Sequence, residues 1–177
     1  MIAFQWLATL CAGLFAGAAL YISLVEHPAR LSCNVSVALA QFAPSYRPSY
    51  RKASWLQASL AGLGLISAVI VWLKSASLLW LAGGLTLGAV IPYTLIAVFP
   101  TNKRLLDPTL DPATSLALAL LRQWGRLHRV RSVLGLLAFM LFIVLYGCAG
   151  WIIPFLILAK LALSGDKTHD AKMARRV

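Results

Sequence analysis

Three side chains that can do chemistry lie close together in a short basic segment, RQWGRLHRVR at residues 122–131. In a helix that turns by about 100° per residue, Trp124, His128 and Arg131 share one face, which leucines border. Histidine is the usual general base near neutral pH, arginine is a permanent cation, and tryptophan offers a flat apolar surface. We therefore expect this face to turn inward. The other arginines fall on the opposite face, toward headgroups or water: Arg122, Arg126 and Arg129.

An acidic residue and a second histidine follow the first apolar run of the chain. Glu26 is the only glutamate in the sequence, and His27 is its neighbour. Burying an arginine is costly without an anionic or hydrogen-bonded partner, so we expect Glu26 to pair with Arg131 or His128. The alternative is that Arg131 extends its guanidinium to the membrane surface and does nothing more.

Two further segments supply candidate binding residues. Tyr46 and Tyr50 occur in the repeated unit PSYRPSYRK, and Asn102 occurs in FPTNKRL. Tyrosines also anchor membrane proteins in the headgroup zone, and an asparagine after a helix is often a cap. Membrane anchoring by the tyrosines and helix capping by the asparagine are therefore alternatives to a role in ligand binding.

The composition indicates a membrane protein. Hydrophobic residues make up 60% of the 177 residues, and charged residues only 12%, against about 25% charged in a soluble domain. The net charge of +11 would suggest nucleic acid in a soluble protein. Here the basic residues lie beside apolar runs, so lipid headgroups are the expected partner and nucleic acid is not.

The apolar runs predict an all-α integral membrane protein, a multi-pass four-helix bundle with two long same-side links that contain short amphipathic helices. Pro28 and Pro100 should end the first and third spans, and Pro92 should kink the third. We expect one transmembrane domain over residues 1–163 and a polar disordered tail over 164–177. The expected spans are 2–25, 54–73, 78–99 and 133–151, the last with an apolar extension to 163.

The distribution of charge indicates an orientation and a place for a site. The long links, 26–53 and 100–132, hold ten of the 16 lysines and arginines, so the positive-inside rule predicts that they are cytoplasmic. The four spans contain no charged residue or histidine, which argues against an ion pump. A site at the link end of the bundle is favoured; the alternative is that long loops simply carry the polar residues.

Four segments together resemble the anthrone oxygenase family of small four-helix membrane proteins. They are EHPAR after span one, FAPSYRPSYRKAS before span two, FPTNKRL after span three, and LLRQWGRLHRVRS before span four. Their order and positions match over about residues 1–150. The resemblance implies a membrane-bound monooxygenase, an oxidoreductase that converts an anthrone, or a similar phenolic or polyketide compound, with O2 as co-substrate and without flavin, haem or added metal.

The resemblance and the helix-face argument together suggest roles for the candidate residues. His128 would act as the base, with His27 as the competing base. Arg131 would hold the anion of a small hydrophobic aromatic substrate, Trp124 would stack on its rings, and Asn102 would donate a hydrogen bond. The remaining candidates for substrate binding are Glu26, Tyr46 and Tyr50.

Three alternatives remain at this stage. A non-enzymatic scaffold or hydrophobic-ligand-binding subunit of the same fold would use the same residues for packing. A metal site would take Glu26, His27 and His128 as ligands, although three residues from separate links are a weak signal. A thiol–quinone oxidoreductase needs a cysteine pair, and the three cysteines form no C-x-x-C motif: Cys11, Cys33 and Cys148.

Overall fold

The computed structural model describes the backbone of residues 1–46 and 52–173, and the side chains of residues 1–46, 55–145 and 147. The described chain is helical and contains no strand, so the predicted all-α class is confirmed. The chain divides into two compact units, Met1–Phe142 and Ile143–Val177. All candidate site residues with described side chains belong to the first unit.

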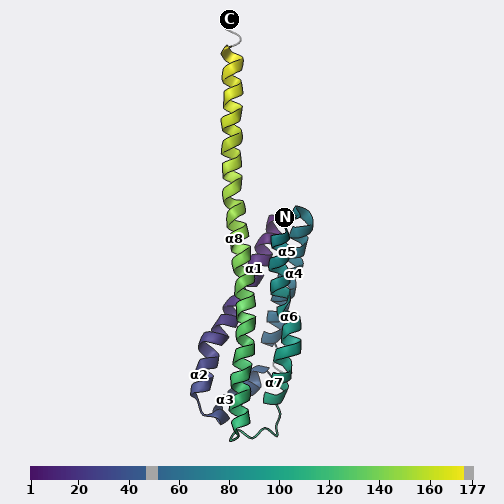
Figure 1. Ribbon diagram of the computed structural model, residues 1–177, viewed down its shortest axis with the longest axis vertical. Coiled ribbons are helices and arrows are strands. Elements are labelled where there is room, and N and C mark those ends of the chain that lie inside the picture. The colour runs from purple at the N-terminus through teal and green to yellow at the C-terminus, as the bar shows by residue number, and fades with distance from the viewer. Residues whose placement is uncertain (47–51, 174–177) are drawn as a thin grey trace. The chain divides into compact units, whose positions relative to one another are not determined.

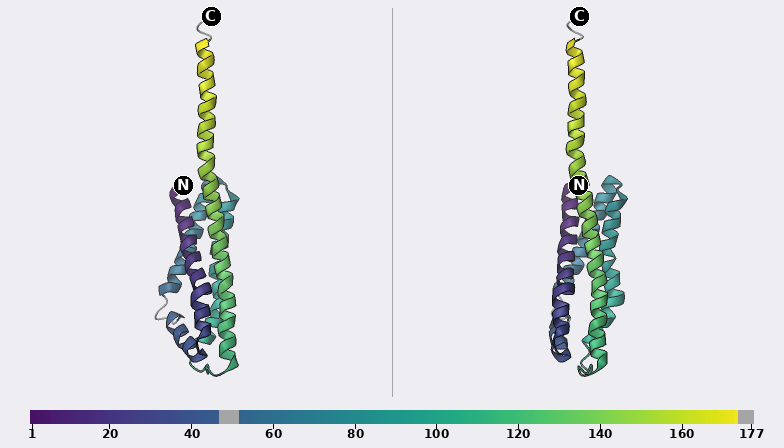
Figure 2. Two further views of the ribbon diagram at one scale, coloured as in Figure 1. Left: turned by 90° about the vertical axis from the view of Figure 1, so that its left-hand side faces the viewer. Right: turned by 60° about the vertical axis from the view of Figure 1, so that its left-hand side comes forward.

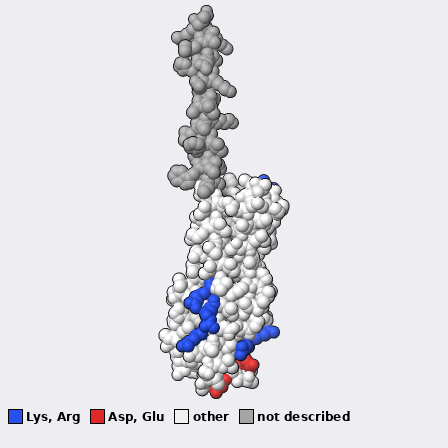
Figure 3. Space-filling view, in the orientation of Figure 1, with Lys and Arg blue, Asp and Glu red and all other residues white. Residues whose placement is uncertain are grey.

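Within the described part of the chain, four helical stretches are long and apolar enough to cross a membrane, as predicted for a multi-pass protein. Within the first unit they run side by side (Figures 1 and 2). Figure 3 shows that the charged side chains on one face of this unit gather mainly toward the end where the two long links lie. The four stretches are Ile2–Ser32, Trp55–Ser75, Leu78–Leu105 and Ser115–Leu145.

The first stretch is longer than predicted because it does not end at His27. It comprises α1 (Ile2–Tyr21), the π-helical turn η1 (Ile22–Glu26) and α2 (His27–Ser32). Pro28 lies in the first turn of α2, where its missing N–H is tolerated. The π turn, with its wider hydrogen-bond spacing, therefore carries the chain past the proline and keeps Glu26 and His27 in a helix.

The third stretch repeats this arrangement, so the prediction that Pro100 ends it is also wrong. The π-helical turn η3 (Thr94–Val98) precedes α7 (Phe99–Leu105), and Pro100 lies in the first turn of α7. Upstream, a turn at Ala89 separates α5 (Leu78–Gly88) from α6 (Val90–Tyr93). This interruption agrees with the effect expected of Pro92, which removes the hydrogen bond to the residue four positions earlier.

The links contain one separate amphipathic helix, and α8 is longer than expected. Helix α3 (Val35–Tyr46) confirms the helix predicted in the first link, and α4 is Lys52–Ser75. In the second link a helix begins at Ser115, and it continues as α8 (Ser115–Met173) without a break. The residues expected to be a disordered tail are thus helical as far as Met173, and residues 174–177 lie outside the described chain.

The helices pack through small residues and a core at the link end. A Cβ on Gly13 would lie 2.8 Å from the Phe139 ring, whereas one on Gly17 would meet nothing within 4 Å. Only the first glycine of the G-x-x-x-G pair therefore serves close packing. The link-end core consists of Ala38, Phe42, Val98, Leu105, Leu120, Leu121 and Trp124.

Candidate functional site

Trp124 lies at the centre of the link-end core and is completely buried. Its indole N–H donates a 2.7 Å hydrogen bond to Asn102 Oδ1 of α7. The indole stacks on the His128 ring at a centroid distance of 4.8 Å and contacts the His27 ring at 5.0 Å. Three other candidates, Asn102, His128 and His27, each from a different helix, therefore meet at one tryptophan.

The predicted partition of the basic segment is confirmed by burial. Trp124, His128 and Arg131 are 0%, 1% and 8% exposed, while Arg122, Arg126 and Arg129 are exposed. A basic segment that only contacts lipid headgroups would not need one buried face and one exposed face. The division shows that one face of α8 packs into the bundle and the other does not.

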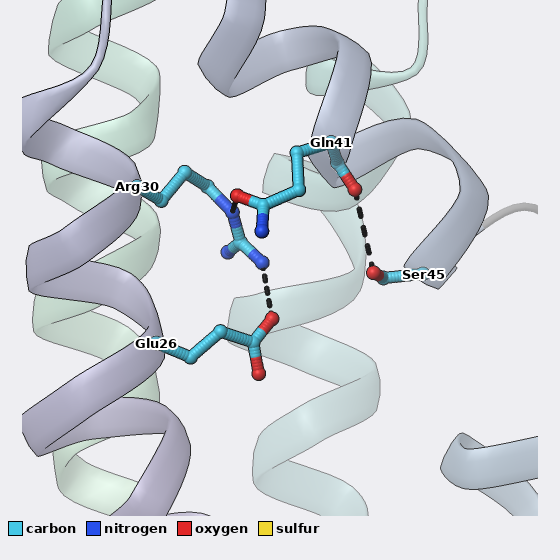
Figure 4. A network of polar contacts seen from close by, with 4 residues as sticks. All are labelled: Glu26, Arg30, Gln41 and Ser45. Atoms are coloured by element: carbon cyan, nitrogen blue, oxygen red, sulfur yellow. Dashed lines mark hydrogen bonds and ion pairs between the residues drawn. The ribbon is translucent and has the colours of Figure 1, made fainter.

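Glu26 pairs with Arg30, so the predicted pairing with Arg131 or His128 is wrong (Figure 4). Arg30 Nη2 donates to the Glu26 carboxylate, and Arg30 Nε donates to Gln41 Oε1 at 3.4 Å. Residues four apart on a helix face one another, and the continuous π turn and α2 put Glu26 and Arg30 in that relation. Arg30 is only 1% exposed.

Arg30 also belongs to the aromatic cluster, and sequence reasoning missed it. Its guanidinium carbon lies 5.5 Å from the Phe42 ring centroid and 5.8 Å from that of Trp124. Tyr46 contacts the same tryptophan edge-on at 5.2 Å. The available signal was the i, i+4 spacing of Glu26 and Arg30 in EHPAR, which matters only if the helix continues through the proline.

Arg131 takes an amide as its partner. Its Nη2 donates a 2.7 Å hydrogen bond to Gln57 Oε1 of α4, and its guanidinium carbon lies 5.8 Å from the Phe15 ring centroid. Arg131 Nε is buried and has no hydrogen-bond partner among the described residues. The cation is therefore held in place by a neutral group, and no described carboxylate lies within ion-pair distance of it.

His128 is held by two serines. Ser132 Oγ donates to the Ala19 carbonyl at 2.9 Å, and Ser23 Oγ lies 2.8 Å from Ser132 Oγ and 3.0 Å from His128 Nδ1. If the Ser132 proton goes to the carbonyl, Ser23 donates to Ser132 and accepts from His128, which assigns the proton to Nδ1. His128 Nε2 then carries the lone pair, and it has no partner among the described residues.

His27 lies against the backbone of α8 at Gly125. A Cβ on Gly125 would lie 2.5 Å from His27 Cδ2 and closer still to Nε2. The missing side chain is therefore what lets the imidazole occupy this position. The Leu121 carbonyl of α8 lies near the His27 ring, but neither ring nitrogen makes a hydrogen bond of ordinary distance and angle in the described part of the chain.

A cavity of about 340 Å³ opens beside this cluster at the link end. Four predicted site residues line it: Glu26, Tyr46, Asn102 and Arg131. Gln57, Ser45 and Thr94 add polar groups, and the remaining wall is apolar. Trp124, His27 and His128 are not among the residues that line this cavity. Trp124 contacts Asn102 and Tyr46 of the cavity wall, and the two histidines contact Trp124. Tyr50 lies outside the described residues.

Tyr46 is a hydrogen-bond donor in this cavity. Burial raises the pKa of its phenol to about 12, so the group is neutral at physiological pH. It can donate to an oxygen anion but cannot act as a base there. Among the described residues, no three His, Cys, Asp or Glu side chains lie close enough together to hold a metal ion.

The fold and the site define a small multi-pass membrane protein with a mostly apolar cavity, which carries a few polar groups, at one end of a four-helix bundle. The sequence model of the anthrone oxygenases matches residues 46–141, more than half of the chain, and the chain belongs to the anthrone oxygenase family. The matched region contains Tyr46, Asn102, Trp124, His128 and Arg131, and the first helix with Glu26 and Arg30 precedes it. A search of curated proteins and a search of solved structures found no match.

Proposed function

We propose that this protein oxidises an anthrone or a similar phenolic compound with O2 inside the link-end cavity, without an organic cofactor or a metal. The observation that carries the proposal is the convergence of Arg131, Tyr46, Asn102 and Glu26 on one mostly apolar cavity. Membership in the anthrone oxygenase family supports it.

The chemistry needs a base and an anion-binding site more than it needs a redox group. Removing a proton from the acidic methylene carbon of an anthrone gives an aromatic phenolate-like anion. This electron-rich anion passes an electron to O2, and the two radicals combine to form a C–O bond. Protonation and loss of one water break the O–O bond and leave a quinone carbonyl, so the anthrone and O2 become the anthraquinone and water.

Arg131 and Tyr46 are the groups we assign to the oxygen anion. Arg131 is a buried cation on the cavity wall whose Nε has no partner in the described chain. Tyr46 offers a neutral phenol as a donor. Donors fixed before the reaction stabilise developing charge strongly where water is excluded.

Asn102 is the third donor, and Trp124 orients it. The indole N–H can bond only to an acceptor, so the amide oxygen of Asn102 faces Trp124. Its NH2 group is then left for the cavity that Asn102 lines. In this proposal Trp124 positions Asn102, and His27 and His128 support the indole from behind.

Glu26 is the base we propose, because its carboxylate lines the cavity. Its ion pair with Arg30 holds the group in place. His128, the base suggested by the sequence, stays the competing candidate: its Nε2 has no partner, but the residue does not line the cavity. We further propose that both long links face the cytoplasm, as the distribution of lysine and arginine suggests.

The experiment is O2 uptake and anthraquinone absorbance with purified protein and anthrone, corrected for the rate in buffer. We expect turnover above that rate, and Glu26→Gln should lower it by about 10²–10⁴-fold, the usual contribution of a general base. His128→Asn, which keeps an amide beside Ser23, should lose far less. Arg104→Gln on the exposed part of α7 is the control and should leave turnover unchanged.

Other outcomes point elsewhere. A larger loss in His128→Asn than in Glu26→Gln would make the histidine the base. No turnover by a folded wild-type protein would favour the other function considered for this fold, a non-enzymatic protein that binds a hydrophobic ligand in the same cavity.

A further inference from the structure

A second hollow lies on the face of α8 opposite to Trp124 and Arg131. It has a volume of about 330 Å³ and is lined by Arg122, Arg126 and Arg129 of α8, with Pro28 and Leu31 of α2 facing them. We call it the arginine groove. No described carboxylate lies within ion-pair distance of its arginines, so three exposed cations share one groove without a counter-charge.

The groove continues into an apolar surface along the same stripe of α8. Steps of three or four residues lead from Arg129 to Val133, Leu137 and Met140, and these three apolar side chains are exposed. Leu24 and Val25, on the π turn beside the groove, are exposed as well. Figure 3 shows the same pattern on its face of the first unit, with basic side chains toward the link end and uncharged surface beyond them.

The dimensions of this stripe match one leaflet of a bilayer. From Arg129 to Met140 a helix rises about 16 Å at 1.5 Å per residue, and half of the hydrocarbon core is about 15 Å. A molecule lying along the stripe would place an anionic group at the arginines and about 15 Å of hydrocarbon beside the valine, leucine and methionine. A glycerophospholipid has this form.

His27 provides a second, independent observation. It lines the arginine groove and is 6% exposed. Its ring lies near the Leu121 carbonyl of α8, but neither ring nitrogen makes a hydrogen bond of ordinary distance and angle among the described residues. Buried polar groups in proteins are normally hydrogen-bonded. A headgroup oxygen in the groove would provide the missing partner.

We propose that the arginine groove is a binding site for the headgroup of an anionic phospholipid, whose acyl chains lie along the apolar stripe of α8. The arginine groove is separate from the link-end cavity. His27 connects the two regions, because it lines the groove and contacts Trp124, which contacts the cavity wall. The inference does not depend on the proposed oxygenation.

The test is native mass spectrometry of the purified full chain with equal amounts of phosphatidylglycerol and phosphatidylcholine. We expect the wild type to retain phosphatidylglycerol preferentially. Arg126→Gln with Arg129→Gln should lower its affinity by about thirtyfold, since each basic residue near a charged membrane surface contributes a factor of about five. Lys103→Gln with Arg104→Gln removes the same charge from exposed positions of α7 and should leave the preference intact.

Each remaining outcome counts against the site. Equal retention of both lipids by the wild type would overturn it, because the charge of the headgroup would then play no part in the binding. An equal loss in both double variants would overturn it as well, because the net charge of the protein alone would then explain the binding. Release of the lipid by a few millimolar inorganic phosphate would indicate a site for a soluble anion instead. If the first double variant does not fold, Arg126→Gln alone should show about a fivefold loss, and no loss would contradict the proposal.

Discussion

Replacing Gly125 with alanine tests whether His27 lies against α8. A methyl group at this position would lie 2.5 Å from His27 Cδ2, about 1 Å short of ordinary carbon–carbon contact. The completely buried Trp124 blocks retreat of the imidazole on one side, so the ring can yield only by turning toward the arginine groove. We therefore expect Gly125→Ala to destabilise the protein, although alanine is the better helix former.

Two opposing effects determine the size of the change. Overpacking a core typically costs about 1–3 kcal/mol, and the higher helix propensity of alanine offsets about 1 kcal/mol. The net loss is up to about 2 kcal/mol. Gly62 is the matched control, because a Cβ there would meet nothing within 4 Å. Gly62→Ala changes only the helix propensity and should raise the free energy of unfolding by up to about 1 kcal/mol.

The assay is thermal unfolding of both variants in the same detergent, followed by tryptophan fluorescence. One kcal/mol corresponds to a shift in Tm of about 2–4 °C for a chain of this size, so Gly125→Ala should melt at least about 2 °C below Gly62→Ala. Adding His27→Ala to Gly125→Ala should recover part of the difference. A Gly125→Ala variant as stable as Gly62→Ala would refute the placement of His27 on α8.

Two further predictions concern the wall of the cavity. Trp124→Phe removes the indole N–H that Asn102 accepts and should lower the free energy of unfolding by about 1–3 kcal/mol, measured by the same melts, while Trp55→Phe at an exposed site should not. Tyr46 should remain protonated up to a pH of about 12. Because burial raises the pKa of this phenol above the ordinary tyrosine value of 10.0, its contribution to stability is complete below pH 10 and is lost as the pH rises through 12. Alkaline unfolding of wild type and Tyr46→Phe, compared between these pH values, measures that loss; identical curves would contradict the burial of Tyr46.

The sequence predicted well what depends on local periodicity. Four apolar runs specify four spans, and a turn of about 100° per residue separates Trp124, His128 and Arg131 from the three exposed arginines. Both results follow from the side chains of one helix at a time. They require no knowledge of how the helices lie against each other.

Predictions failed where the backbone departs from a regular α-helix or where two helices must be placed. Pro28 and Pro100 suggested helix ends, but a π turn before each proline lets the helix continue. The pairing of Glu26 followed from this error, since Arg30 faces it only on a continuous helix. The hydrogen bond from Arg131 to Gln57 depends on how α4 packs against α8, and so does the cavity. The sequence of a single segment does not specify how two helices pack.

The central claim is that Arg131 holds the substrate anion in the link-end cavity, and its most direct test is kcat/KM of Arg131→Gln with anthrone. Glutamine keeps an amide at the position of the guanidinium while removing the charge. We expect kcat/KM to fall by about 10²–10³-fold, the usual effect of removing one oxyanion donor, and to stay unchanged in Arg104→Gln. A folded Arg131→Gln protein with wild-type kcat/KM would contradict the assignment of this cavity as the site of the reaction.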